Sequence, residues 1–103
     1  MELVTMVYQL TWHLPKEEIY GLTSQIRRCA ISIPSNIAEG SQRDTNRNFD
    51  YFLRISKGST AELETQLLIA KNLGYVKEQN LFEKIFDLLI EIRRMLSGLR
   101  SKL

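Results

Sequence analysis

The stretch QIRRCAISIPSNIAEG, from Gln25 to Gly40, decides the fold because it carries a helical repeat together with an interior proline. Its apolar side chains recur at three- and four-residue steps, so they share one face of a helix. The same spacing continues toward the N-terminus, so the whole stripe comprises Ile19, Leu22, Ile26, Cys29, Ile33 and Ile37. We therefore expect a helix over residues 15–39, with Gly40 as the residue that follows its C-terminal cap.

Pro15, Gly40 and Gly74 divide the rest of the chain into segments that all have helical periodicity. They predict further helices over about residues 2–13, 44–73 and 78–99, with N-terminal capping groups for the third helix from Ser41, Asp44 or Thr45. No segment alternates polar and apolar residues as a strand does. The predicted fold is an all-α, antiparallel up-down four-helix bundle with a short first helix, forming one domain of residues 1–103.

Pro34 lies inside the helix predicted over residues 15–39. It has no amide to bond the carbonyl of Ala30, which costs about 3 kcal/mol in an undisturbed helix. We expect a kink that leaves this carbonyl to a side chain or a water. A complete break is the alternative, since Asn36 and Glu39 have capping-box spacing, although the restarted helix would have barely one turn.

A row of polar residues lies beside the apolar stripe of this helix, and it is either a solvated face or a seam between helices. The surface that remains, with Ala30, Ile31 and Ala38, is too apolar for a convincing solvent face. The third predicted helix offers matching polar groups, and Gly58 beside them is small enough for a close approach. We expect Arg28 to pair with Glu62 in a structural polar seam that specifies register more than stability, within one subunit or between two. The seam comprises Gln25, Arg28, Ser32, Asn36, Glu39, Ser59 and Glu62.

The last predicted helix has an unusually wide apolar arc. Its stripe of Leu81, Ile85, Leu88, Ile92, Met95 and Leu99 is widened by Phe82, Phe86, Leu89 and Leu96. The arc reaches roughly 180°, against about 100° for a surface helix. A deeply buried helix is the alternative, but a four-helix bundle of this size surrounds none of its helices. The arc therefore predicts self-association.

Composition excludes several classes of protein. Hydrophobic residues at 44% and charged residues at 25% are typical of globular domains, and a net charge of +2 does not demand a polyanionic partner. A single cysteine excludes an internal disulfide, and no apolar run reaches the ~18 residues that span a bilayer. We expect a cytoplasmic protein without membrane insertion.

The sequence contains no recognisable catalytic, metal or cofactor site. His13 is the only histidine and lies at a helix junction, no Glu-x-x-His pair is present, and Cys29 lies on the apolar stripe as a small hydrophobe. Glycine-rich phosphate loops are absent. We predict no enzymatic activity, no metal, no cofactor and no small-molecule substrate.

Basic residues suggest a nucleic-acid surface near the corner of the second and third helices and near the C-terminus. The candidates are Arg27, Arg43, Arg47, Arg54, Lys57, Arg93 and Arg94, with Arg100 and Lys102 adding to the basic C-terminal end. The alternative is that these arginines are solvated partners of Asp44, Asp50 and Glu91. Repetition around an oligomer would convert weak phosphate contacts into avidity.

Four motifs carry a resemblance to a known family: PKEE at 15–18, YGLTSQIRRCAISIPSNIAEG at 20–40, FDYFLRISKGSTAELETQL at 49–67 and LGYV at 73–76. They resemble the small four-helix-bundle proteins named after intervening sequences in 23S rRNA genes. Cys29 and Ser56 stand where that family usually has alanine. The first helix looks a turn or two shorter than in relatives, so we expect it to pack incompletely.

The resemblance implies an up-down bundle and assembly into rings of five subunits. A similarity to an accessory protein of a reverse transcriptase, another pentameric bundle thought to bind nucleic acid, supports RNA or DNA binding by analogy. The sequence thus predicts a non-enzymatic homopentamer that binds RNA or DNA. The alternative is a scaffold that binds another protein through the same apolar and basic faces.

Overall fold

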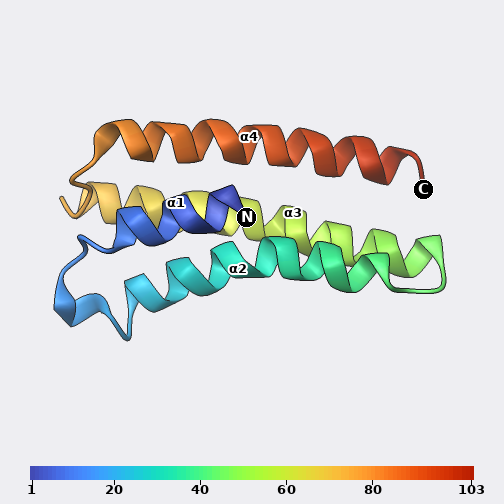
Figure 1. Cartoon of the computed structure of the whole chain (residues 1–103), viewed down its shortest axis with the longest axis horizontal. Helices are drawn as coiled ribbons and strands as arrows, with labels where there is room; N and C mark the ends of the chain where they lie inside the picture. The colour runs from blue at the N-terminus through green and yellow to red at the C-terminus, as the bar shows by residue number, and fades with distance from the viewer.

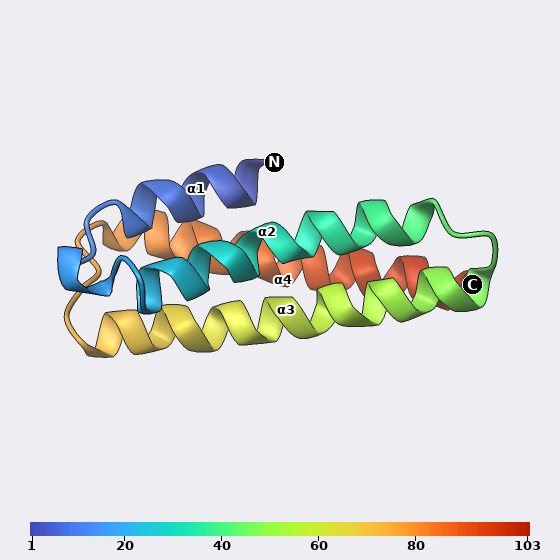
Figure 2. The same ribbon diagram turned by 90° about the horizontal axis from the view of Figure 1, so that it is seen from below.

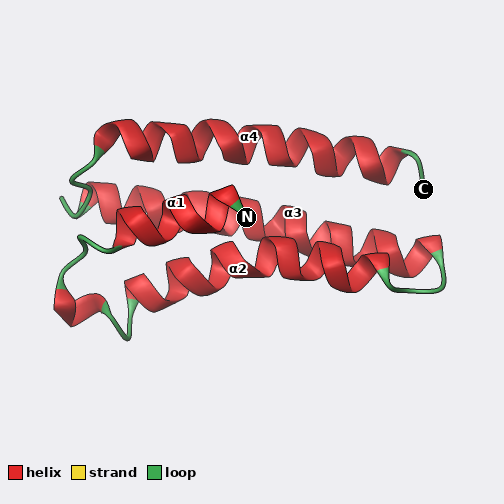
Figure 3. Cartoon of the chain, viewed as in Figure 1, coloured by secondary structure: helices red, strands yellow, loops and turns green.

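The computed structural model describes residues 1–103 as four α-helices and one short 3₁₀ helix (Figures 1 and 3). These elements are α1 (Glu2–Thr11), η1 (Lys16–Glu18), α2 (Leu22–Ser41), α3 (Asn46–Asn72) and α4 (Gln79–Ser101). Each α-helix packs on its two neighbours, and the diagonal pairs are not in close contact. The structure confirms the predicted all-α, up-down four-helix bundle. None of its helices is long and apolar enough to cross a membrane.

The first helix, α1, packs tightly but covers only part of the bundle. Leu3, Val7 and Leu10 are completely buried against the core, so the expected incomplete packing is wrong for this apolar stripe. With 10 residues, however, α1 is half as long as α2, which has 20. Figures 1 and 2 both place the N-terminus near the middle of the bundle. The C-terminal half of α4 therefore extends beyond α1.

The second helix begins at Leu22 rather than at Pro15, which corrects the predicted boundary. The chain forms η1 first, and Gly21 is the N-cap of α2. Glu18 explains the start: one carboxylate oxygen accepts from the Leu22 amide at 3.3 Å, and the other accepts from the Tyr75 hydroxyl at 3.2 Å. Burial and the Glu18 carboxylate together raise the pKa of Tyr75. The carboxylate thus caps α2 and ties it to the α3–α4 turn.

Gly40 does not terminate the helix, contrary to the sequence-based expectation, because α2 continues to Ser41. It is buried against α3 instead. A Cβ at this position would lie 2.7 Å from the Phe52 Cβ and 3.0 Å from the Phe49 Cδ1. A Cβ added at Gly58 would meet no atom within 4 Å, so the predicted close approach at Gly58 is not made within the chain. Gly40 is the residue that lets α2 and α3 approach closely.

Both ends of α3 follow standard capping chemistry. The Thr45 hydroxyl accepts from the Asn48 amide at 3.1 Å, so Thr45 is the cap among the three predicted candidates. At the other end Gly74 has a φ of +79°, which favours glycine. The Tyr75 amide then donates to the Ala70 carbonyl at 3.0 Å, which satisfies an unpaired carbonyl of the last turn.

Pro34 is accommodated within a continuous α2, so the alternative of a complete break is wrong. Figure 1 shows the helix axis changing direction near its middle, in agreement with a kink. We expected a side chain or a water to bond the free carbonyl of Ala30, but no side chain donates to it. The buried Ser56 hydroxyl donates instead to the Ile33 carbonyl at 2.9 Å, which links α3 to the turn that contains the proline.

The core draws on all four helices, and α4 presents a different face to it than the sequence predicted. The core cluster comprises Leu3, Val7, Leu10, Leu14, Ile26, Cys29, Ala30, Ile33, Leu63, Leu67, Ala70, Phe82, Ile85 and Leu89. Leu96 of α4 is also buried, whereas Met95 and Leu99, members of the predicted stripe, are exposed. Leu88 and Ile92 are half-buried. An apolar strip of α4 therefore remains uncovered in the single chain.

Candidate nucleic-acid interface and polar seam

Five of the seven predicted seam residues line one open groove of about 330 Å³ between α2 and α3. The groove is lined by Gln25, Arg28, Cys29, Ser32, Ser59, Glu62 and Gln66. The Ser32 and Ser59 hydroxyl oxygens are hydrogen-bonded at 2.8 Å, and the Cys29 thiol donates to the Ser59 carbonyl at 3.2 Å. The polar contact between α2 and α3 in this groove thus centres on Ser59.

Arg28 and Glu62 form no ion pair within the chain, so their pairing remains a prediction only for a contact between subunits. The nearest partner of Glu62 is one turn away on its own helix, where its carboxylate accepts from the Gln66 amide at 3.3 Å. Arg28 is exposed and makes no side-chain hydrogen bond, and the same holds for Gln25. These side chains therefore lie unpaired along the groove.

Two further seam residues bond to residues four positions away, one within α2 and one just after it, rather than to α3. The Asn36 amide donates to the Ser32 carbonyl at 2.7 Å, and Glu39 forms an ion pair with Arg43 at 2.6 Å. Both contacts join residues four apart, the spacing that brings side chains together on one helix. Of the seven predicted residues, only Ser32 and Ser59 join the two helices through side chains.

Gln66 is a polar residue of the groove that sequence reasoning did not place in the seam. Its side chain is only 9% exposed, and its Oε1 is buried without a hydrogen-bond partner. The available signal was a glutamine between the apolar positions Leu63, Leu67 and Ala70 of α3. The groove therefore contains an unsatisfied acceptor next to unpaired donors.

The Cys29 thiol is held in an unreactive setting, and His13 contacts a carboxylate. Burial, with a contribution from the charge of Glu62, raises the pKa of the Cys29 thiol to about 11, so little thiolate exists at neutral pH. The His13 Nε2 lies 3.0 Å from the Glu78 Oε1, and this contact links the segment after α1 to the start of α4. The structure contains no group of three or more His, Cys, Asp or Glu side chains that could hold a metal ion.

Two basic clusters that are separate in sequence lie at one end of the bundle. Figures 1 and 2 place the α2–α3 corner and the C-terminus of α4 together, and Arg100 donates to Asp50 across them at 2.8 Å. We call this region the basic end, and its cations are Arg43, Arg47, Arg54, Arg100 and Lys102. Three acidic residues, Glu39, Asp44 and Asp50, accompany them, which leaves an excess of two positive charges. That excess equals the net charge of +2 of the whole chain.

Several candidate cations are paired with acidic neighbours, although of the predicted partners Asp44, Asp50 and Glu91 only Asp50 takes part. Arg43 pairs with Glu39, Arg54 pairs with Asp50 at 3.3 Å, and Arg93 pairs with Glu64. Asp50 is shared by two arginines, Arg54 and Arg100. The hydrogen bond from Arg100 and the nearby charges of both arginines lower the pKa of Asp50. The candidates that form no ion pair are Arg27, Arg47, Lys57 and Arg94.

A surface hollow of about 580 Å³ marks the start of α3 at the basic end. It is lined by Thr45, Arg47, Asn48, Tyr51 and Arg54. The Arg54 guanidinium lies 5.8 Å from the centre of the half-exposed Tyr51 ring. Sequence reasoning missed Tyr51, although its position between Arg47 and Arg54 at helical spacing was a usable signal. Two arginines and an aromatic ring thus surround this hollow.

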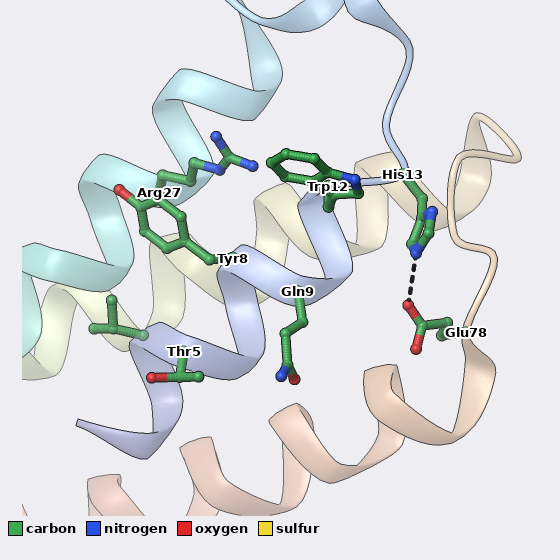
Figure 4. A pocket seen from close by; sticks show the side chains of 8 residues that line it. Thr5, Tyr8, Gln9, Trp12, His13, Arg27 and Glu78 are labelled. Atoms are coloured by element: carbon green, nitrogen blue, oxygen red, sulfur yellow. Dashed lines mark ion pairs between the residues drawn. The ribbon is translucent and has the colours of Figure 1, made fainter.

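Arg27 lies far from the other candidates, on the side of the bundle that α1 covers. Its Nε donates to the Thr11 hydroxyl at 2.9 Å, and its guanidinium lies 4.6 Å from the centre of the Tyr8 ring. Figure 4 shows the guanidinium between Tyr8 and Trp12. Sequence reasoning missed both aromatic residues, although their four-residue spacing places them on one face of a helix.

Comparison with known proteins agrees with the motif resemblance. Residues 1–98 match the family described as 23S rRNA-intervening sequence protein, a range that includes α1, α2, α3 and most of α4. No curated protein gives a significant match. With the match extending over nearly the whole of a four-helix bundle, the chain belongs to the 23S rRNA-intervening sequence protein family.

Proposed function

We propose that this chain is the subunit of a non-enzymatic homo-oligomer, a ring of five, that binds RNA or DNA through its basic surfaces. The observation that carries the proposal is the convergence of the α2–α3 corner and the C-terminus of α4 into the basic end. Because phosphate contacts are electrostatic, a local excess of positive charge matters more than the small net charge of the chain.

The case for self-association rests on surfaces that the single chain leaves uncovered. Ile90, Met95 and Leu99 of α4 are exposed, and the α2–α3 groove contains the unpaired Arg28 and the unsatisfied Gln66. These are two different faces of the molecule. When one face of a subunit binds a different face of the next, the assembly can close into a ring. The number five comes from the family resemblance alone.

The case for nucleic acid rests on the chemistry of the basic end. Arg47 forms no ion pair, and Arg54 and Arg100 share the single carboxylate of Asp50. Arginine binds phosphate through bidentate, charge-assisted hydrogen bonds. One subunit presents few such contacts, but a ring would present five copies and gain avidity.

A protein-binding scaffold is the second candidate, and the exposed apolar strip of α4 favours it. Exposed apolar side chains such as Met95 and Leu99 can be buried against another protein, and methionine is enriched at protein interfaces. The two candidates differ in salt dependence. Phosphate contacts weaken steeply as salt rises, whereas apolar contacts do not.

The test is retention of labelled single-stranded RNA and duplex DNA over a series of KCl concentrations. Replacing both Arg47 and Lys102 by Gln should weaken binding and reduce the salt slope by about 2, because each phosphate contact contributes about 1. Lys84→Gln, at an exposed position near the start of α4, is the matched control and should bind as the wild type does. Absence of binding even at low salt would exclude the nucleic-acid function. Sedimentation that reports a monomer at micromolar concentration would exclude the ring.

A further inference from the structure

A second and larger hollow lies on the outer side of α1, away from the basic end. Its volume is about 920 Å³, and it is lined by Val4, Thr5, Tyr8, Gln9, Trp12, His13, Arg27 and Glu78. Trp12 is 78% exposed, although indole is among the most apolar of side chains. No contact within the chain accounts for a tryptophan in this position. Together with the Tyr8 ring, it gives the hollow an exposed aromatic lining.

Arg27 is held in place beside this ring by neutral groups. Its Nε donates to the Thr11 hydroxyl at 2.9 Å, and the Tyr8 ring lies under its guanidinium at 4.6 Å. No carboxylate neutralises it. Figure 4 shows the guanidinium between the Tyr8 ring and the Trp12 indole. The hollow therefore presents a preorganised, uncompensated cation next to exposed aromatic surface.

The lining suits a ligand that has both an aromatic face and polar atoms. Three of the eight lining residues are hydrophobic, and the other five carry hydrogen-bonding or charged groups. Gln9 and Thr5 also line the hollow, on the side of α1 that faces α4 in Figure 4, and supply polar groups there. The volume falls within the range of about 300–1,000 Å³ that is usual for ligand sites. Proteins that bind single-stranded nucleic acids without sequence preference stack the bases on aromatic side chains and use arginine beside them.

We propose that this hollow binds an unpaired base of a single-stranded RNA or DNA, which stacks on the Trp12 indole while Arg27 holds the neighbouring phosphate. The inference rests on the proposed nucleic-acid function and adds to it a preference for single strands. A duplex cannot present an unstacked base without paying the cost of unpairing it. The basic end and this stacking site are distinct surfaces, so each can be tested while the other stays intact.

Trp12 is the only tryptophan of the chain, so its fluorescence reports on this site alone. Addition of a 12-nucleotide oligouridylate should quench it in a saturable manner, and a duplex of equal length should not. Trp12→Leu, measured by anisotropy of the labelled oligonucleotide, should bind roughly 5- to 150-fold more weakly, the range for loss of one stacked base. Arg27→Gln should weaken binding and reduce the salt slope by about 1. Tyr20→Leu is the control, because Tyr20 is almost fully exposed and lines none of the hollows around Arg27.

Each remaining outcome separates this inference from the proposed function. If Trp12→Leu binds as tightly as the wild type, the stacking site is refuted while the basic end remains. If no oligonucleotide binds at any salt concentration, both ideas fail together. A second copy of the chain that covers the ring would shift the Trp12 emission to shorter wavelength as the protein concentration rises, and Trp12→Leu would then dissociate the assembly. These two results together would overturn the inference. Equal quenching by free uridine monophosphate would indicate a mononucleotide site and would overturn the preference for strands.

Discussion

Gly40 provides the most direct test of how α2 and α3 pack. In Gly40→Ala, the new Cβ would lie 2.7 Å from the Phe52 Cβ and 3.0 Å from the Phe49 Cδ1. The Phe52 Cβ is bonded to the α3 backbone and cannot rotate away, so the two helices must separate slightly. Overpacking of this kind costs about 1–3 kcal/mol. Alanine stabilises a helix by about 1 kcal/mol relative to glycine, so the net loss in the free energy of unfolding should be about 0–2 kcal/mol.

Two glycines of the same chain serve as matched controls. Gly58 and Gly98 lie within α3 and α4, and a Cβ at either would meet no atom within 4 Å. Gly58→Ala and Gly98→Ala should therefore stabilise the protein by about 0.5–1 kcal/mol each. The difference between Gly40→Ala and these controls removes the helix-propensity term. It should equal the packing cost, about 1–3 kcal/mol.

The assay is urea unfolding followed by circular dichroism at 222 nm, with every variant at one protein concentration because self-association couples to stability. If Gly40→Ala is stabilised as much as Gly58→Ala and Gly98→Ala, the close approach of α2 to α3 at Gly40 is refuted. If Gly58→Ala alone loses its gain, a helix of another subunit lies over Gly58. That second result would locate a subunit contact on α3.

Three further predictions follow from single contacts. Cys29 should react with iodoacetamide about 100-fold more slowly at pH 8 than a thiol of pKa 9.0, because its pKa is about 11, and Glu62→Gln should accelerate the reaction; a rate equal to that of free cysteine would contradict the burial. Asp50 has a lowered pKa, so its stabilising contribution is present above the ordinary value of 3.8 and declines as the pH falls below it. Asp50→Asn should remove that part of the pH dependence in urea titrations, and by releasing Arg54 and Arg100 it should tighten RNA binding; unchanged binding would mean that these arginines face no phosphate. Thr45→Ala should cost about 1 kcal/mol by removing the cap of α3, with Ser41→Ala, at the end of α2, as a control expected to be near neutral.

Much of the fold could be predicted because it depends on local patterns. The apolar stripe through Ile26 and Ile33 identifies a helix without any knowledge of its neighbours. Thr45 and Gly74 mark the ends of α3 through bonds made within a few residues. Three long periodic segments joined by short turns leave little choice but an antiparallel bundle.

The site could be predicted only in part, since its partners come from different helices. The pairing of Arg28 with Glu62 was inferred from spacing alone, but Glu62 bonds instead to Gln66 on its own helix. The stacking of Arg27 on Tyr8 depends on how α1 lies over α2, which no periodicity reveals. Exposure of Trp12 was equally invisible, because an apolar residue near a helix end is usually assigned to the core.

The sequence by itself determined the number of α-helices, their order and the apolar stripe of α2 through Ile26 and Ile33, because helical propensity, capping and periodicity act between residues a few positions apart. Only the tertiary structure decided that Gly40 is a contact rather than a terminator, and that the α2–α3 corner and the end of α4 form one basic surface. Those outcomes depend on distances between segments up to 50 residues apart in sequence, as for Arg100 and Asp50. Such distances are set by the packing of whole helices rather than by any local signal.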